Sequence, residues 1–379
     1  MRVLHVHAKG AFHGGVEQIL RDTAIGLQAR GWPQGLLALD GDIDAEFASV
    51  FETSGSGLDV LASFRPDVLL IHKVEDAETV AALAARVPSV RMVHDHDLVC
   101  PRRHKYFPLS QRICDKPAGI ACYTHLCCVQ RAPADSLFPV RISGTGAVRR
   151  GLAANSKVSG FIVGSRWMRD ELDMNGIPAE RISIIPPVPA ALSRSAPKPP
   201  STQPRILYVG QVIRGKGVDL LLRALARVEA PWHLKVIGTG NHLESCRQLA
   251  SQLGIAHKVD FTGWIAHEEL ETHYAASTFT VVPSRWPEPF GMVGLEAMAR
   301  GRAVVGFDAG GIGDWLEDGV TGRLVPAADV GAMADALEQL LENPAQAADM
   351  GRAGAERVAG KFTHEAYLDA MMQALENAA

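Results

Sequence analysis

Two cations lie on a glycine-flanked turn in the second half of the chain. The run is Gly210-Gln-Val-Ile-Arg214-Gly-Lys216-Gly217, and it follows a short apolar stretch at 205–209. A guanidinium can bind two oxygens and an ammonium adds a point charge, so this turn predicts a phosphate clamp. It lacks the G-x4-G-K-[ST] spacing of a Walker loop. A plain solvent-exposed turn is the alternative interpretation.

Two carboxylates follow in the same half, eight residues apart. Glu288 lies in the loop Trp286-Pro-Glu288-Pro-Phe-Gly291, and Glu296 lies in a helix expected near 293–300. A carboxylate on a helix can bind two ribose hydroxyls, as acidic residues do in dinucleotide sites. Acid and base roles in a hydrolase are a second interpretation. One helix-terminal charge and one surface charge are the third.

The first half offers two further candidates, each after an apolar strand. His94-Asp95-His96-Asp97 follows the stretch 90–93, where imidazoles and carboxylates can position hydroxyls or move protons. A metal site and a simple capped turn stay open as alternatives. Gly14-Gly15, after His13, opens the first helix, and there a ligand anion could approach the backbone N–H groups. A tight turn is the alternative.

The elements that position these residues alternate between apolar strands and helices. Apolar runs at 2–7, 67–71, 90–93 and 161–163 predict a parallel sheet covered on both faces. The alternation restarts at 205–209 after a Pro-rich linker. We therefore expect an α/β protein of two Rossmann-like, doubly wound domains that face each other across a cleft. The expected parts are an N-terminal domain at 1–188, a linker at 189–204, a C-terminal domain at 205–361 and a final helix at 362–379.

The segment 100–158 breaks this alternation and is strongly basic. It holds ten Lys and Arg against two Asp, a net charge of +8 in a chain whose total is −4. We expect an irregular elaboration of the first domain, with a helix near 140–154, that meets an anionic partner. A solvated surface with a chance excess of cations is the alternative.

Five of the six cysteines lie in this segment. Cys100, Cys114, Cys122 and Cys127 could form a structural zinc site, although their spacing fits no compact knuckle. Small buried hydrophobic side chains are the equal alternative. A disulfide framework is not expected in a cytosolic enzyme of this size.

Bulk composition is ordinary for a soluble globular protein. The 379 residues are 47% apolar and 21% charged, without a run of eighteen apolar residues or a signal peptide at the N-terminus. We expect a cytoplasmic protein, at most peripheral on the inner face of the membrane, with no nucleic-acid partner.

Taken together, these motifs resemble those of retaining glycosyltransferases of family 4, which have the GT-B fold. The resemblance covers nearly the whole chain and is strongest in the second domain. Its motifs there are Gly210 to Gly217, Phe261-Thr-Gly263, Val282-Pro-Ser284, Glu288-Pro-Phe-Gly291, Glu296-Ala-Met and Gly310-Gly311. One departure is Gln211, where many members have Arg; Arg214 is expected to supply the guanidinium.

The resemblance implies a role for each matched residue. Arg214 and Lys216 would bind the donor diphosphate without a metal, Glu296 the ribose, and Glu288 the donor sugar. The other implied donor contacts are Gly14, Gly15, Gly210 and the backbone N–H groups of Phe290, Gly291, Met292 and Val293. His94 would lie near the reacting face of the sugar, and with Glu288, Arg214 and Lys216 it makes the implied catalytic set. The final helix would cross back to the first domain.

The resemblance also implies a nucleotide-sugar donor, UDP ahead of GDP, and a glycan or glycolipid acceptor in cell-envelope glycan synthesis. We expect the basic segment to meet that acceptor or an anionic membrane. The residues assigned to this surface are Asp95, His96, Arg102, Arg103, Lys105, Arg149 and Arg150, with Tyr106 and Phe107 as interface aromatics. A GT-B sugar-nucleotide epimerase, a transferase with a small-molecule acceptor and a nucleotide-sugar-binding regulator are the rivals. A dinucleotide oxidoreductase is disfavoured because the first turn lacks G-x-G-x-x-G.

Overall fold

The computed structural model describes residues 1–12, 14–132, 136, 138–142, 144–194, 197–201, 203–266 and 269–379. His13, part of the predicted glycine turn, lies outside them. The chain divides into two compact units. Unit 1 comprises 1–109, 115–190 and 364–379, and unit 2 comprises 110–114 and 191–363.

Two of the predicted boundaries differ from these units. Residues 110–114, predicted to belong to the first domain, group with unit 2. The expected linker 189–204 is not a free connection, because its described residues from 191 on also group with unit 2. The buried guanidinium of Arg302 explains part of this grouping, since it donates to the carbonyls of Lys198 and Pro199.

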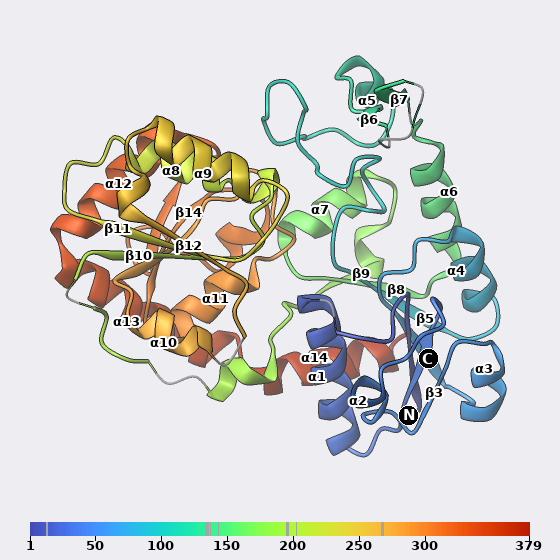
Figure 1. The fold of residues 1–379 in the computed structure, drawn as a ribbon. Helices are drawn as coiled ribbons and strands as arrows, with labels where there is room; N and C mark the ends of the chain where they lie inside the picture. The colour runs from blue at the N-terminus through green and yellow to red at the C-terminus, as the bar shows by residue number, and fades with distance from the viewer. Residues whose placement is uncertain are drawn as a thin grey trace. The chain divides into compact units, whose positions relative to one another are not determined.

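Unit 1 contains a parallel sheet whose described strands lie in the order β3-β2-β1-β4-β5-β8-β9 (Figure 1). The strands are β1 (Val3–His7), β2 (Gln34–Ala38), β3 (Thr53–Gly55), β4 (Val68–Ile71), β5 (Ser89–Val93), β8 (Gly160–Val163) and β9 (Ile182–Ile184). The central strands β1, β4 and β5 are buried throughout. This burial confirms the prediction of a parallel sheet covered on both faces.

Most helices of unit 1 lie between these strands along the chain, and the last one follows unit 2. They are α1 (Gly15–Ala29), α2 (Ala45–Ala48), α3 (Asp59–Phe64), α4 (Ala77–Ala84), α6 (Gly146–Ala154), α7 (Arg166–Met174) and the final α14 (His364–Glu376). In Figure 1, α14 (red) lies beside α1 (blue), and the hydroxyls of Thr23 and Tyr367 are 2.6 Å apart. Arg30 adds ion pairs to Glu365 and Asp369. The chain therefore returns to unit 1 through its last helix.

Unit 2 contains a second parallel sheet, with its described strands in the order β12-β11-β10-β13-β14-β15. The strands are β10 (Arg205–Val209), β11 (His233–Ile237), β12 (Val259–Gly263), β13 (Phe279–Val282), β14 (Ala303–Phe307) and β15 (Gly322–Val325). The helices are α8 (Val218–Leu225), α9 (Leu243–Gln252), α10 (Leu270–Ala275), α11 (Met292–Ala299), α12 (Val330–Glu342) and α13 (Pro344–Lys361). Two doubly wound units with parallel sheets are the predicted fold class.

The basic segment contains little regular structure. Before α6, its described residues form only the short helix α5 (Ile120–Thr124) and an antiparallel pair of strands, β6 (Val129–Arg131) and β7 (Val140–Ile142). The helix predicted near 140–154 is wrong over its first residues, because 140–142 pair with β6 and the helix starts only at Gly146.

Glycine at 217 permits two loops of unit 2 to touch. Its φ is +72°, and a Cβ there would lie 1.8 Å from the carbonyl oxygen of Pro283. Gly254 has nearly the same φ, +73°, but open space around it. The two positions therefore separate the backbone cost of a side chain from its steric cost.

We expect Gly254→Ala to lower the free energy of unfolding by about 1 kcal/mol, the cost of left-handed backbone in an L-residue. Gly217→Ala should lower it by about 3 kcal/mol, because the loop must also move away from the new methyl group. Urea unfolding of the two variants measures both values. Equal losses would contradict the close approach to Pro283.

Candidate functional site

The predicted phosphate clamp of unit 2 is joined to the loop that carries Glu288. Arg214 to Lys216 form a short 3-10 turn after β10. The backbone N–H groups of Arg285 and Trp286 both donate to the carbonyl of Gly215, each at 3.0 Å. These bonds and the contact at Gly217 hold the turn against the loop that follows β13. Both segments leave the carboxyl ends of neighbouring strands, where open α/β sheets bind ligands.

Lys216 and Glu288 form an ion pair across the two loops. The Lys216 ammonium donates to both carboxylate oxygens of Glu288, at 2.7 and 2.9 Å, and the Ser284 hydroxyl donates to the same carboxylate. Glu288 is only 4% exposed. Burial alone would raise its pKa, but the Lys216 charge and the hydrogen bonds outweigh burial, so the pKa is lowered. Glu288 is therefore ionised at neutral pH although it is buried.

The start of α11 is shaped by glycine and tryptophan. Gly291 precedes the helix with a φ of +91°, and the indole N–H of Trp315 donates to the carbonyl of Phe290 at 2.6 Å. The first N–H groups of a helix have no intrahelical partner, and they favour a negatively charged or hydroxylated ligand. Met292 and Val293 are the first two residues of this helix. The structure thus places the predicted backbone donors at a helix start beside the Glu288 loop.

The remaining predicted donor residues differ in their surroundings. Arg214 is exposed on its turn, and Gly210 has a φ of +145° that suits glycine. Glu296 is half-buried on α11 and contributes to the raised pKa of the buried Tyr274 hydroxyl, of which burial is the main cause. The ribose role of Glu296 stays a prediction.

Arg285 is a residue of this site that the sequence analysis missed. It is 2% exposed, and its guanidinium contacts Asp219 on α8 at 2.6 Å and the Gln111 side-chain oxygen at 2.7 Å. It therefore connects the Glu288 loop to the helix that follows the clamp. Its position directly after the Val282-Pro-Ser284 motif is the signal that could have identified it.

Unit 1 gathers polar side chains at the carboxyl ends of β1, β4 and β5. His94 accepts or donates a hydrogen bond with His72 at 3.0 Å, and His7 contacts Glu17, in the first turn of α1, at 3.1 Å. Burial lowers the pKa of His94 to about 3. His94 is therefore a neutral imidazole at pH 7, suited to hydrogen bonding with hydroxyls. Gly14 and Gly15 begin α1 at the same end of the sheet.

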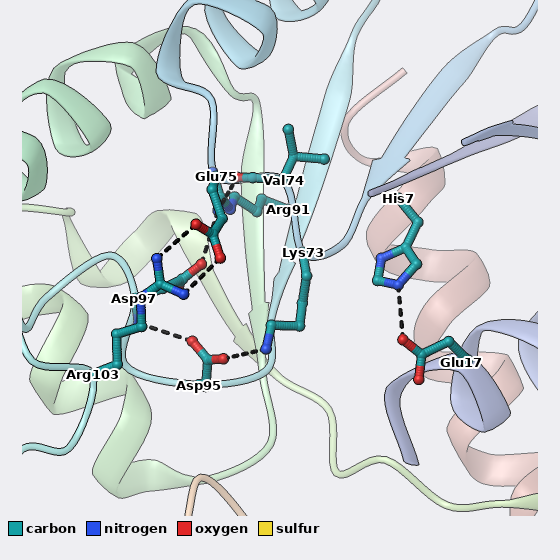
Figure 2. Close-up of polar contacts among 9 residues, drawn as sticks. All are labelled: His7, Glu17, Lys73, Val74, Glu75, Arg91, Asp95, Asp97 and Arg103. Atoms are coloured by element: carbon teal, nitrogen blue, oxygen red, sulfur yellow. Dashed lines mark hydrogen bonds and ion pairs between the residues drawn. The ribbon is translucent and has the colours of Figure 1, made fainter. Parts of the chain in front are cut away.

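Figure 2 shows a network of ion pairs among residues on β5 and in the segments that follow β4 and β5. The Lys73 ammonium contacts Asp95 at 2.6 Å, and the buried Arg91 lies 3.5 Å from Asp97. Burial and the nearby Asp95 raise the pKa of Asp97 to about 6. Asp95 is thus paired with Lys73 within unit 1, and its assignment to an acceptor stays a prediction.

Several residues predicted for the acceptor or membrane surface are placed otherwise. Lys105 is 2% exposed and forms an ion pair with Glu171 at 2.8 Å, so it cannot meet a membrane. Tyr106 and His96 are buried as well, the latter edge-on to Trp167. Arg103, in contrast, is exposed and forms a two-bond pair with Glu75, whose oxygens it contacts at 2.6 Å; its assignment to the acceptor or membrane surface stays a prediction.

Other residues of that prediction do lie on the surface. Arg149 and Arg150 are exposed on α6, whereas Arg102 is half-buried above the Tyr106 ring. Exposed apolar side chains that the sequence analysis did not select gather in the same basic segment. They are Leu109, Ile120, Tyr123, Leu126, Val129, Phe138, Val140 and Ile142.

Three of the five cysteines of the basic segment pack together as apolar groups. Cys122, Cys127 and Cys128 form a buried cluster against Phe107, and the described cysteines form no disulfide. Within the described residues there is no group of three or more His, Cys, Asp or Glu side chains that could hold a metal. This packing favours the buried-hydrophobe alternative, and the zinc site at Cys100, Cys114, Cys122 and Cys127 stays a prediction.

A cavity of about 520 Å³ in unit 2 lies away from these residues. It is lined by the first residues of β10 and β11 together with Trp232, His273 and Ser277. These positions are at the amino ends of the strands, opposite the end where the clamp lies. The cavity is therefore not part of the candidate site.

The chain is similar to known glycosyltransferases in sequence. Residues 191–357 match the family model described as "Glycosyl transferases group 1". A GDP-mannose-dependent alpha-(1-6)-phosphatidylinositol monomannoside mannosyltransferase of Mycolicibacterium smegmatis is 33% identical over 58% of this chain and 61% of that protein. A D-inositol 3-phosphate glycosyltransferase of Geodermatophilus obscurus is 38% identical over 46% of this chain and 40% of that protein. The chain thus matches less than two thirds of the length of either relative.

Solved structures match over the full length. Sucrose-phosphate synthase from Thermosynechococcus elongatus superposes with a TM-score of 0.75 at 21% identity, covering 98% of both chains. Anabaena HepE in complex with UDP has a TM-score of 0.73 at 20% identity, covering 99% of this chain and 100% of that one. At this identity the likeness concerns the fold, and it confirms the GT-B prediction. Among the described residues, no helix has the length and apolarity needed to cross a membrane.

The buried Lys105–Glu171 pair allows a direct test of the finding that Lys105 is buried and not on the predicted membrane surface. We expect Lys105→Met to lower the free energy of unfolding by about 3 kcal/mol at pH 7, because Glu171 loses its partner inside the protein. Replacing both residues, as Lys105→Met with Glu171→Leu, should restore most of that loss. Urea unfolding measures each value. The control is Lys116→Met at an exposed lysine, which should change the stability by less than about 0.5 kcal/mol; a similar small effect of Lys105→Met would mean that Lys105 is on the surface.

Proposed function

We infer that this chain, whose residues 191–357 match the family model of the group 1 glycosyl transferases, is a glycosyltransferase that uses a nucleoside diphosphate-sugar donor. The observation that carries the inference is the Lys216–Glu288 pair in unit 2. It places a cation suited to phosphate beside a buried, ionised carboxylate suited to sugar hydroxyls. A nucleotide-sugar-binding regulator would use the same two groups, so the formation of a glycosylated product distinguishes a transferase from it.

In this proposal unit 2 holds the donor. Lys216 and Arg214 bind the diphosphate, and the first N–H groups of α11 add to the positive potential there. These groups counter the charge that develops on the leaving diphosphate, so that Mg²⁺ is not needed at the phosphates. Glu288 accepts hydrogen bonds from hydroxyls of the donor sugar, and Glu296 from those of the ribose.

We further propose that transfer retains the anomeric configuration. The bond between the anomeric carbon and the phosphate oxygen breaks, and the acceptor oxygen bonds to the same face of the sugar. The acceptor hydroxyl gives up its proton, and the departing diphosphate takes one. Product stereochemistry, read from the proton coupling at the anomeric carbon, tests this step.

The relatives differ in the nucleotide that their names print. The mycobacterial mannosyltransferase is named for GDP-mannose, whereas HepE was solved with UDP. We propose UDP for this chain and test it against GDP. Consumption of the donor without any acceptor would instead favour a GT-B epimerase.

Nucleotide binding should depend on Lys216 and not on divalent metal. A ligand at 100 times its dissociation constant adds about 2.7 kcal/mol to the stability of the native state. We expect UDP or a UDP-sugar to raise the melting temperature in the presence of EDTA, by the increase that corresponds to this added stability. In Lys216→Met the affinity should fall at least about tenfold, because a charge-assisted hydrogen bond is lost.

Lys361→Met, which removes an exposed lysine at the end of α13, is the matched control and should keep the wild-type affinity. A shift with GDP alone would replace UDP by GDP. No shift with any nucleotide would contradict the proposed donor site.

We propose that the acceptor is lipid-linked and that the basic segment of unit 1 meets the membrane that holds it. The basic segment offers exposed apolar side chains such as Ile120 (82% exposed) and Ile142 (78%) as well as the exposed Arg149 and Arg150. Apolar groups that can enter a lipid interface, together with cations that attract anionic headgroups, are typical of peripheral membrane surfaces. Tyr123, half-exposed on α5, adds an interfacial aromatic residue.

We expect the chain to float with vesicles that contain phosphatidylglycerol, and less with phosphatidylcholine alone. Two double variants, Ile120→Ser with Ile142→Ser and Arg149→Glu with Arg150→Glu, should each reduce binding at least about tenfold. Leu58→Ser and Arg86→Glu alter an exposed leucine and arginine elsewhere in unit 1 and serve as controls. Unchanged flotation and turnover in both double variants would contradict the membrane proposal.

A further inference from the structure

Four side chains of unit 1 form a continuous line of hydrogen bonds that ends at His94. The Gln34 side-chain oxygen lies 2.9 Å from His5 Nε2, and His5 Nδ1 lies 3.2 Å from His72 Nε2. His72 Nδ1 in turn lies 3.0 Å from His94 Nε2. The three rings also stack, with centroid separations of 5.5 Å and 5.3 Å.

The line follows the order of the strands. Gln34 is on β2 and His5 on β1, while His72 and His94 directly follow β4 and β5, the next two strands of the sheet. Gln34, His5 and His72 are at most 1% exposed, whereas His94 is half-buried. The line therefore runs from the interior of unit 1 to a partly accessible imidazole.

The Gln34 amide gives the line a direction. Its nitrogen donates to the backbone carbonyl of Trp32 at 2.8 Å, so the amide cannot be turned around without losing that bond. The amide oxygen that faces His5 can only accept. His5 Nε2 must therefore carry a proton.

All three imidazoles are neutral at pH 7. Burial lowers the pKa of His5 to about 4 and that of His94 to about 3. Burial, with the adjacent rings of His94, His5 and His7, also places the pKa of His72 well below its ordinary value. A neutral imidazole has one donor and one acceptor nitrogen. The hydrogen bond at one nitrogen of a ring therefore determines whether its other nitrogen donates or accepts.

The tautomers follow in sequence. His5 donates through Nε2 and so accepts through Nδ1, which requires His72 to donate through Nε2. His72 then accepts through Nδ1, which requires His94 to donate through Nε2. Among the described residues His94 makes its hydrogen bond through this nitrogen, so that Nδ1 stays available as an acceptor. His7 does not compete, because it lies edge-on to His72 and its Nε2 contacts Glu17.

We propose that Gln34, His5 and His72 are positioning residues that set the tautomer of His94, which presents Nδ1 to the ligand as a hydrogen-bond acceptor. Given the proposed function, this nitrogen would take a hydroxyl of the sugar as its donor. A sugar with only an acceptor group at that position, such as a carboxylate, would be rejected, because no proton lies between the two atoms.

The tautomer can be measured without any substrate. Long-range proton–nitrogen correlation spectra of the full chain, labelled at histidine nitrogen, separate protonated from unprotonated ring nitrogens, and His94→Gln assigns the His94 signals. We expect His94 to be protonated at Nε2 and not at Nδ1 at pH 7. A proton on Nδ1 of His94 would overturn the proposal.

Variants test the direction of the line. Gln34→Met keeps the volume but removes the fixed acceptor, and His72→Phe keeps a ring but removes both nitrogens. Both should leave His94 as a mixture of tautomers, and His72→Gln, which retains a donor and an acceptor, should partly restore the wild-type state. Tyr367→Phe, which removes the buried hydroxyl bonded to Thr23, is the control and should leave the His94 tautomer unchanged. A wild-type tautomer of His94 in Gln34→Met would overturn the proposal.

Kinetics give the second readout. Once a donor is identified, His72→Phe should lower kcat/KM about tenfold, the worth of one well-placed hydrogen bond, and His72→Gln should recover part of it. A full tautomer pattern in a chain that transfers no sugar would support the relay and overturn the proposed function. Sugar transfer by a chain whose His94 carries its proton on Nδ1 would support the proposed function and overturn the relay.

Discussion

The ion pair between Lys216 and the buried carboxylate of Glu288 is the interaction on which the candidate site of unit 2 depends. A carboxylate that is 4% exposed is stable in its charged form only when a cation and hydrogen-bond donors face it, and these are Lys216 and Ser284. Two loops from different strands must therefore lie against each other. The left-handed backbone of Gly217 and the Gly215 carbonyl, which accepts from Arg285 and Trp286, permit that contact. The backbone geometry of these glycines thus serves the electrostatics of the site.

At the carboxyl ends of its strands, unit 1 carries buried histidines in place of the charged pair of unit 2. Its buried imidazoles are kept neutral by burial, and their hydrogen bonds run in one direction because a single amide is fixed by Trp32. The neighbouring charges of Lys73, Asp95, Arg91 and Asp97 are paired among themselves (Figure 2). The unit therefore offers His94 as a polar but uncharged group, whereas unit 2 offers full charges.

The spacing of apolar residues and glycines along the chain was sufficient to predict the sheets and the loops at their strand ends. Two parallel-sheet units, the clamp at Arg214 and Lys216 and the loop of Glu288 were all predicted from strand ends and glycines. Lys105 was misplaced because a count of charges along the chain cannot detect Glu171, which is distant in sequence and adjacent in the fold. His5 and His72 were missed because each lies in or after a strand that is otherwise apolar, where a histidine gives no periodic signal. The available signal was that histidine recurs in or after three strands. Only the strand order shows that these strands are neighbours and that the histidines lie side by side.

The most direct test is calorimetric binding of a nucleoside diphosphate and of its sugar conjugate to the wild type and to Glu288→Gln. If Lys216 binds phosphate and Glu288 binds sugar, the diphosphate alone should bind the variant at least as tightly as the wild type, because Lys216 is released from its partner. The sugar conjugate should lose the additional affinity that the sugar provides. An equal loss of affinity for both ligands would mean that Glu288 only maintains the shape of the loops, and it would contradict the division of roles between the two residues.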